Sequence, residues 1–332
     1  MVAKDMAVAF LFPGQGAQYQ GMALDFLKAG GELRALFALA SDIMGQDMKD
    51  LLENAGDETL KRTDVSQPVI TLANLAAAAF LKERGLSPAG CAGFSLGEYA
   101  ALVVSAVISL EDCFRLVKAR GRVMQESVDS IKAESAKKNP GAAPDTVEPG
   151  MAAVIGLSPS QVETLIAQWT AEGLTGLYGA NFNSPRQVVV AGTAEALAEA
   201  QERFKAAGAR RVLRLPVAGP FHSPLIAGAA EKFAPFLEKV SFKDPAIPLY
   251  SNVSGKPVRT GAEARELALK QITNPVRWIE EEEAIAASGI GAVVETGPGK
   301  VLQGLWKETG SALPCYAAGT VEAAEEFLKV EP

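Results

Sequence analysis

Short apolar runs alternate with helical patterns along most of the chain. The first run, residues 6–12, is continuous and of strand length, which is typical of a strand covered on both faces of a sheet. A second run of small apolar residues, 91–94, leads through a glycine-rich turn into a helical pattern over 98–104. Three later runs also predict strands: 247–250, 292–295 and 314–317. These segments predict an α/β unit.

A different alternation fills the middle of the chain. In order, the pattern predicts a strand, a helix, two strands, a helix and a strand: 151–157, 159–169, 177–182, 187–191, 194–207 and 211–215. This βαββαβ order predicts a ferredoxin-like subdomain, in which two helices cover one face of a four-stranded sheet. We therefore expect a small subdomain at 150–216, inserted into a larger one formed by 1–149 and 217–332.

Helical patterns and a change of composition mark the segment before that insertion. An alanine-rich helical pattern covers 68–81, and a second helix is expected to open at Ser109, where Asp112 completes a capping-box pattern, and to run through Met124. The stretch 129–149 is polar, rich in Pro and Gly, and without a hydrophobic period. We expect it to be a surface loop or a partly disordered insertion.

Composition and charge restrict the class of protein. The chain has 332 residues, 48% of them hydrophobic and 21% charged, as in ordinary soluble globular proteins. The net charge of −7 argues against nucleic acid as the main partner. No uncharged stretch reaches membrane-spanning length and no signal-peptide pattern is visible, so we expect no membrane partner and a cytoplasmic location. Three cysteines without metal-ligand spacing predict neither a disulfide framework nor a metal site.

One serine and one histidine are the first candidates for chemistry. Ser95 lies in a Gly-x-Ser-x-Gly pattern between the predicted strand and helix, and His222 is the single histidine of the chain. Such a strand-turn-helix exposes the serine hydroxyl at the edge of a sheet, with the amide of Leu96 free to bind an oxyanion. A serine needs a nearby base, which here only His222 can supply as an imidazole. The alternatives are a glycine-rich packing turn and a buried core histidine.

Six short segments occur along the chain in the order found in one enzyme family. They are Phe12-Pro13-Gly14-Gln15-Gly16, Gly93-Phe94-Ser95-Leu96-Gly97-Glu98-Tyr99-Ala100-Ala101-Leu102, Arg120-Gly121 with Met124-Gln125, Asn181-Phe182-Asn183-Ser184-Pro185, Pro220-Phe221-His222-Ser223-Pro224 and Gly297-Pro298-Gly299-Lys300. Together they resemble malonyl-CoA:acyl carrier protein transacylases over nearly the whole chain. The resemblance implies an α/β-hydrolase-like large subdomain with an inserted ferredoxin-like one, in agreement with the alternation of strands and helices.

The resemblance also implies a role for each matching residue. Ser95 would be the nucleophile and His222 its general base and acid. The backbone amides of Gln15 and Leu96 would form the oxyanion hole. Arg120 would pair with the malonyl carboxylate, since its planar guanidinium fits a carboxylate with two hydrogen bonds. Without the resemblance, Arg120 would read as an ordinary solvated cation on a helix face.

Other matching positions would complete the site. The family orients its histidine with a backbone carbonyl, and the matching residue is Gln271. Met124, Asn183 and Phe221 would line the pocket. The chain departs from the pattern at Phe94, where many members of the family have a histidine before the serine.

The implied reaction moves a malonyl group from malonyl-CoA to the phosphopantetheine thiol of acyl carrier protein through a malonyl-serine, for fatty acid synthesis. It needs no protein-bound cofactor. A discrete polyketide acyltransferase is the near alternative. A serine hydrolase or thioesterase would place an acid between serine and histidine in chain order and gives no reason for a pocket arginine. A non-catalytic carrier-binding protein is disfavoured because every reactive position is present. Basic candidates for docking an acidic carrier are Lys61, Arg62, Arg210, Arg211 and Lys300.

Overall fold

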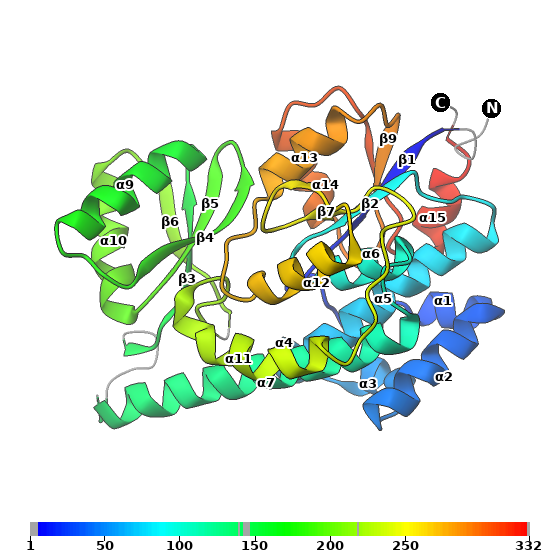
Figure 1. Ribbon diagram of the computed structural model, residues 1–332, viewed down its shortest axis with the longest axis horizontal. Coiled ribbons are helices and arrows are strands. Elements are labelled where there is room, and N and C mark those ends of the chain that lie inside the picture. The colour runs from blue at the N-terminus through cyan, green and yellow to red at the C-terminus, as the bar shows by residue number, and fades with distance from the viewer. Residues whose placement is uncertain (1–5, 139, 142–146, 218, 331–332) are drawn as a thin grey trace.

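Four parallel strands form the central sheet of the larger lobe (Figure 1). The computed structural model describes residues 6–138, 140–141, 147–217 and 219–330. The sheet has the order β10-β9-β1-β2, with bounds β1 Val8–Phe12, β2 Gly90–Gly93, β9 Ala292–Glu295 and β10 Cys315–Ala317. All five residues of β1 are buried, as expected for an apolar strand inside a sheet with both faces covered. Phe12 pairs with Gly93, so the loops that follow β1 and β2 leave the sheet side by side.

The helices of the larger lobe come from the parts of the chain before and after the inserted subdomain. They are α1 Leu24–Ala29, α2 Glu32–Met44, α3 Met48–Asn54, α4 Asp57–Lys61, α5 Thr63–Glu83, α6 Glu98–Val104, α7 Leu110–Lys138, α11 Ala227–Leu237, α12 Gly261–Lys270, α13 Trp278–Ala286, α14 Val301–Glu308 and α15 Val321–Phe327. Within the described residues α5 alone is long and apolar enough to cross a membrane, but 83% of its apolar window is buried inside the protein. It is a core helix, and it contains the predicted 68–81 segment.

The predicted loop at 129–149 is wrong over its first ten residues. Helix α7 continues through residue 138 and forms the long helix along the lower edge of Figure 1. Polar residues continue the helix because several are strong helix formers and lie in favourable pairs, such as Glu134 and Lys138 at 2.7 Å. Ile131 also packs against the core. Pro140 and Gly141 lie in a turn, and the residues of the prediction at 139 and 142–146 lie outside the described residues.

The smaller lobe has its own antiparallel sheet, at the left of Figure 1. Its strands are β3 Gly150–Ile155, β4 Leu177–Ser184, β5 Gln187–Gly192 and β6 Arg211–Arg214, in the order β4-β5-β3-β6. Its helices are α9 Pro159–Ala171, with a complete capping box at Ser158, and α10 Ala194–Ala206. A separate apolar cluster, which includes Trp169 and Phe204, fills the space between the sheet and these helices. This is the predicted ferredoxin-like arrangement, and all of its elements lie inside the predicted range.

The two lobes meet along β4 and the segment before α13. The amide of Phe182 donates to the carbonyl of Val276 at 2.8 Å, and the amide of Val276 donates to the carbonyl of Ala180 at the same distance. The predicted strand 247–250 is shorter than expected: β7 (Tyr250–Ser251) pairs with β8 (Lys256–Pro257), and Leu249 forms a single bridge with Cys91. Pro248 explains the short pairing, because it has no amide proton to donate.

Candidate active site

Ser95 lies in a sharp turn between β2 and helix α6, at the first residue of a single 3₁₀ turn, Ser95–Gly97. Its φ of 50° is in the left-handed region that side chains rarely adopt. Both glycines of the pattern are required by close backbone packing: a Cβ at Gly93 would overlap the backbone of Gly97, and a Cβ at Gly97 would overlap that of Phe12. The turn is therefore a nucleophile elbow in which only glycine fits on either side of the serine.

His222 lies next to this serine, although 127 positions separate them in the chain. Its Nε2 is 2.8 Å from Ser95 Oγ, and its Nδ1 is 2.8 Å from the backbone carbonyl oxygen of Gln271. A carbonyl oxygen only accepts, so Nδ1 carries the proton and Nε2 is free to accept the serine proton. The predicted pair and the predicted orienting carbonyl are thus brought together. The loop that carries His222 is also strained, with φ 57° at the histidine.

The environment of His222 keeps its imidazole neutral. Burial, and next the positive charge of Arg120, lower its pKa from 6.5 to about 4, while the hydrogen bond to Gln271 acts in the opposite direction. A neutral imidazole at physiological pH can accept the proton of Ser95 as soon as the serine attacks a substrate.

The loop after β1, which carries Gln15, lies against the elbow, which carries Ser95 and Leu96. The loop after β1 is held against the elbow, since Phe94 donates its amide to the Phe12 carbonyl at 2.9 Å and a Cβ at Gly14 would overlap the Phe94 carbonyl. Within the described residues, the amides of Gln15 and Leu96 have no protein acceptor. Two free amides in neighbouring loops are what an oxyanion hole requires, and their role remains a prediction.

Arg120 is a buried cation, so the reading of it as a solvated helix-face residue is wrong. It lies on α7 with 1% of its surface exposed, whereas Arg115 on the same helix has 59% of its side chain exposed and pairs with an acid. Its Nη2 donates to Gln271 Oε1 at 3.0 Å, and its Cζ lies 5.5 Å from the centre of the Tyr99 ring. Its Nε has no acceptor, and no carboxylate of the described residues lies within 4.0 Å. The guanidinium therefore has donors to spare for a carboxylate from outside.

Gln271 joins the base through its backbone carbonyl to the nucleophile and this arginine through its side chain. Besides the bond from Arg120 to its Oε1, its Nε2 lies 3.0 Å from the Ser95 carbonyl oxygen, 3.1 Å from Glu98 Oε2 and 3.1 Å from Asn252 Oδ1. The prediction gave Gln271 only its backbone role. The side chain places the same residue at the centre of a buried hydrogen-bond network.

Two residues of this network were not predicted from the sequence. Asn252 accepts the Ser95 amide with its Oδ1 at 2.7 Å and donates to the Gly93 carbonyl at 2.8 Å, so it holds the elbow from both sides. The backbone amide of Asn252 donates to Glu98 Oε2 at 2.9 Å, and its side-chain Nδ2 also donates to Glu281 Oε1 at 2.7 Å. Glu98 directly follows the elbow in the sequence, and that position was a usable signal. No local pattern marked Asn252.

The other predicted pocket residues are buried, but their roles remain predictions. Met124 lies one helical turn after Arg120, and its sulfur accepts a hydrogen bond from Gln67 at 3.4 Å. Asn183 is 6% exposed with no partner for its Oδ1, and Phe221 directly precedes the histidine and is also 6% exposed. Phe94, which departs from the family pattern, packs edge-on against Trp278 with ring centres 5.4 Å apart.

The basic residues proposed for carrier docking are in different situations. Lys61 and Arg62 each form an ion pair with a nearby acid, at 2.7 and 2.9 Å. Arg211 belongs to β6, an edge strand of the small sheet. Lys300 precedes α14 and follows Gly299, where a Cβ would lie 3.9 Å from Ala17 in the loop after β1. Lys300 is therefore the candidate that the fold places beside the active-site loops.

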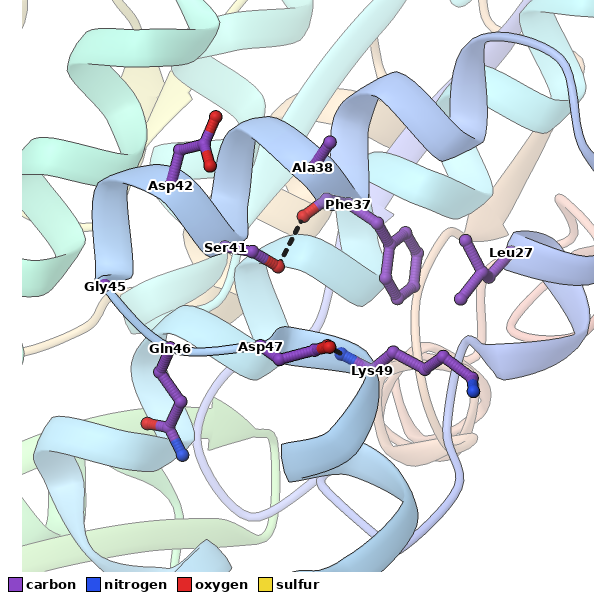
Figure 2. Close-up of a pocket in the computed structure, with 9 residues that line it drawn as sticks. All are labelled: Leu27, Phe37, Ala38, Ser41, Asp42, Gly45, Gln46, Asp47 and Lys49. Carbon is purple, nitrogen blue, oxygen red and sulfur yellow. Dashed lines mark hydrogen bonds between the residues drawn. The ribbon is translucent and has the colours of Figure 1, made fainter.

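A hollow away from this site has an ordinary structural explanation. It lies beside α2 and the start of α3, as Figure 2 shows, and contains none of the residues described above. Its polar groups serve the helix ends: Asp47 accepts the amides of Lys49 and Asp50, and Ser41 Oγ donates to the Phe37 carbonyl. Among the described residues no three His, Cys, Asp or Glu side chains are grouped as metal ligands would be.

The site contains a nucleophile elbow, a neutral histidine and a buried arginine without a carboxylate partner among the described residues, and the comparisons show that the chain is an acyltransferase. The chain belongs to the acyl transferase family: the family model "Acyl transferase domain" matches residues 9–176 and 142–324. It is 38% identical to the malonyl CoA-acyl carrier protein transacylase of Escherichia coli K12, over 97% of this chain and 99% of that one.

Two solved structures have the same fold over nearly their whole length. The malonyl-transacylase of Streptococcus pneumoniae has a TM-score of 0.86 at 34% identity, covering 97% of this chain and 99% of that one. A malonyl-transacylase solved in complex with its type II polyketide acyl-carrier protein has a TM-score of 0.86 at 36% identity, with the same coverage. The predicted family and the predicted two-subdomain fold are therefore confirmed.

Proposed function

We propose that this protein transfers a malonyl group from malonyl-CoA to the phosphopantetheine thiol of acyl carrier protein, in the supply of fatty acid synthesis. One observation carries the proposal: Gln271 contacts the base through its carbonyl and the buried arginine through its side chain. The nucleophile and a partner for a substrate carboxylate are thus fixed within one network.

The reaction proceeds in two symmetrical halves. Ser95 attacks the thioester carbonyl while His222 Nε2 takes its proton, and the amides of Gln15 and Leu96 stabilise the oxyanion, each worth about 3 kcal/mol. His222 then gives the proton to the departing CoA thiolate and leaves a malonyl-serine. In the second half, His222 takes the proton of the carrier thiol, and the thiol sulfur attacks this ester. His222 then returns the proton to the departing Ser95 oxygen, which regenerates the serine and leaves the malonyl group on the carrier thiol. Serine, histidine and arginine supply every group required, so the scheme includes no protein-bound cofactor and no metal.

The arginine selects the acyl group. Arg120 donates hydrogen bonds from its Nε and Nη groups to the malonyl carboxylate, whereas an acetyl group would leave these donors unpaired in a buried site. The relatives and the composition support a soluble enzyme, and we place it in the cytoplasm, where malonyl-CoA and its carrier would meet it.

A polyketide carrier is the second candidate for the acceptor, because one similar structure is a malonyl-transacylase bound to such a carrier. Transfer assays with labelled malonyl-CoA separate the possibilities. We expect rapid transfer to the holo carrier protein of fatty acid synthesis and little release of free malonate without a carrier. Preferential transfer to a polyketide carrier would change the pathway. Release to water at the same rate with and without a carrier would instead identify a hydrolase.

A further inference from the structure

Arg120 is buried without a carboxylate partner, so another group has to balance its charge while the site is empty. Glu98, the first residue of α6, is the acid that faces it, and only 3% of its surface is exposed. The Oε2 of Glu98 accepts from the Asn252 amide at 2.9 Å and from Gln271 Nε2 at 3.1 Å. Two hydrogen bonds donated to one carboxylate oxygen favour the ionised form of this acid.

The amide of Gln271 lies between the two charged groups. Its Nε2 faces Glu98, and its Oε1 accepts from Arg120 Nη2 at 3.0 Å. An ionised carboxylate only accepts and a guanidinium only donates, so the amide has one favourable orientation and links the two charges through its dipole. No direct ion pair within 4.0 Å joins Glu98 and Arg120, so their charged atoms are more than 4.0 Å apart. The Nε donor of Arg120, which has no acceptor among the described residues, is therefore left for a substrate carboxylate while Glu98 keeps its own hydrogen bonds.

The environment of each remaining titratable group around Glu98 favours its neutral form. Tyr99, its neighbour on α6, has a pKa raised chiefly by burial. Glu281 on α13 shares Asn252 with Glu98, and burial followed by the Glu98 charge raises its pKa well above the ordinary value. His222 is neutral because its pKa is lowered to about 4. Burial thus favours the neutral form of these three groups, and Arg120 is the cation that acts on Glu98.

We propose that Glu98 is a specificity-determining residue that balances the charge of Arg120 in the empty site and takes up a proton from solvent when a malonyl carboxylate binds to Arg120. This inference rests on the proposed role of Arg120 as the carboxylate partner. The bound carboxylate places a second negative charge near one guanidinium, and two carboxylates that share one cation cannot both stay ionised without a cost. Protonation of Glu98 removes that cost, and an acyl group without a carboxylate does not require it.

The direction and range of the pH effect follow from the environment of Glu98. Burial, opposed by its hydrogen bonds and then by Arg120, raises the pKa of Glu98 from 4.5 to about 7. A malonyl carboxylate is ionised throughout the range above pH 6 and raises the Glu98 pKa further. Affinity for malonyl-CoA therefore falls as pH rises through 7, by about tenfold between pH 6 and pH 8.5. Acetyl-CoA contains the same CoA group without the carboxylate, so its affinity lacks this slope.

Calorimetry of a variant that cannot be acylated tests the proposal. Ser95→Ala is titrated with malonyl-CoA and with acetyl-CoA at pH 6, 7.5 and 8.5, in two buffers that differ in ionisation enthalpy. We expect malonyl-CoA to bind with net proton uptake at pH 7.5 and to weaken about tenfold over the range, relative to acetyl-CoA. Adding Glu98→Gln keeps the acceptor oxygen and removes the charge. That double variant should bind malonyl-CoA with neither proton uptake nor the extra slope.

The outcomes separate this proposal from the one on which it rests. Equal pH slopes for the two ligands, or the same proton uptake with and without Glu98→Gln, would overturn the role of Glu98. Arg120→Ala in the same Ser95→Ala background should lose malonyl-CoA affinity. If this variant bound malonyl-CoA as tightly as Ser95→Ala, the role of Arg120 as the carboxylate partner would be wrong. Should the Glu98→Gln protein fail to fold, the proton count in Ser95→Ala alone decides, since absent uptake there contradicts the proposal.

Discussion

Replacing Arg120 with alanine should remove malonyl transfer selectively. The guanidinium is 1% exposed, has a free Nε and makes one hydrogen bond, to Gln271. A hydrogen bond to a charged group contributes about 1.5 to 3 kcal/mol, so losing one such bond to the substrate lowers kcat/KM for malonyl-CoA by about tenfold to 150-fold. Acetyl-CoA makes no such bond. Its turnover should stay constant or rise, because the buried donors that an acetyl group leaves without an acceptor are gone.

The assay for this prediction is acyl transfer to carrier protein with each acyl-CoA, together with a thermal melt. Arg115→Ala is the matched control, since Arg115 lies on the same helix with 59% of its side chain exposed. It should leave both activities unchanged. Damage to the fold would depress both substrates together and lower the melting temperature. Equal losses for malonyl and acetyl transfer in a well-folded Arg120→Ala protein would refute the role of Arg120 as the carboxylate partner.

Three further predictions concern the base, a buried acid and the carrier surface. His222→Ala should lower kcat by about a hundredfold to ten-thousandfold. The wild-type kcat at saturating malonyl-CoA should stay level down to pH 6, because a histidine with a pKa of about 4 stays neutral there; a fall in kcat centred at pH 6.5 would contradict this. Burial raises the pKa of Glu282 to about 9, so stability is lost as pH rises from about 4.5 to 9. Glu282→Gln should raise Tm by several degrees at pH 8 and little at pH 5, with exposed Glu283→Gln as control. Lys300→Glu should raise the KM for carrier protein about tenfold at low salt while leaving Ser95 acylation unchanged; equal KM values would remove Lys300 from the docking surface.

The sequence was sufficient to predict that Ser95 and His222 lie together, and to predict the strands of both sheets, because these depend on local patterns and on a single histidine. The elbow around Ser95 needs glycine on both sides, and a strand covered on both faces is a continuous apolar run. The extension of α7 was missed because residues 129–138 carry no hydrophobic period, although Glu134 and Lys138 pair along the helix. Helix propensity and ion pairs decided that segment.

The buried network behind the site depends on contacts that no local pattern records. Asn252 holds the amide of Ser95 from 157 positions away. Glu98 is the first residue of a helix, where an acid is ordinarily solvated and interacts favourably with the positive end of the helix dipole. Only the packing of α6 against α7 makes it a buried neighbour of the arginine. The role of such a residue follows from its burial, which the order of polar and apolar residues does not give.

Peptide mapping of the acylated enzyme tests the central claim most directly. The protein is incubated with malonyl-CoA without a carrier, digested and examined by mass spectrometry, then compared with a sample to which holo carrier protein has been added. The account predicts a malonyl group on the peptide that contains Ser95, its loss on addition of the carrier, and no adduct in Ser95→Ala. Efficient malonyl transfer with no adduct on Ser95, or with the adduct on another residue, would contradict it.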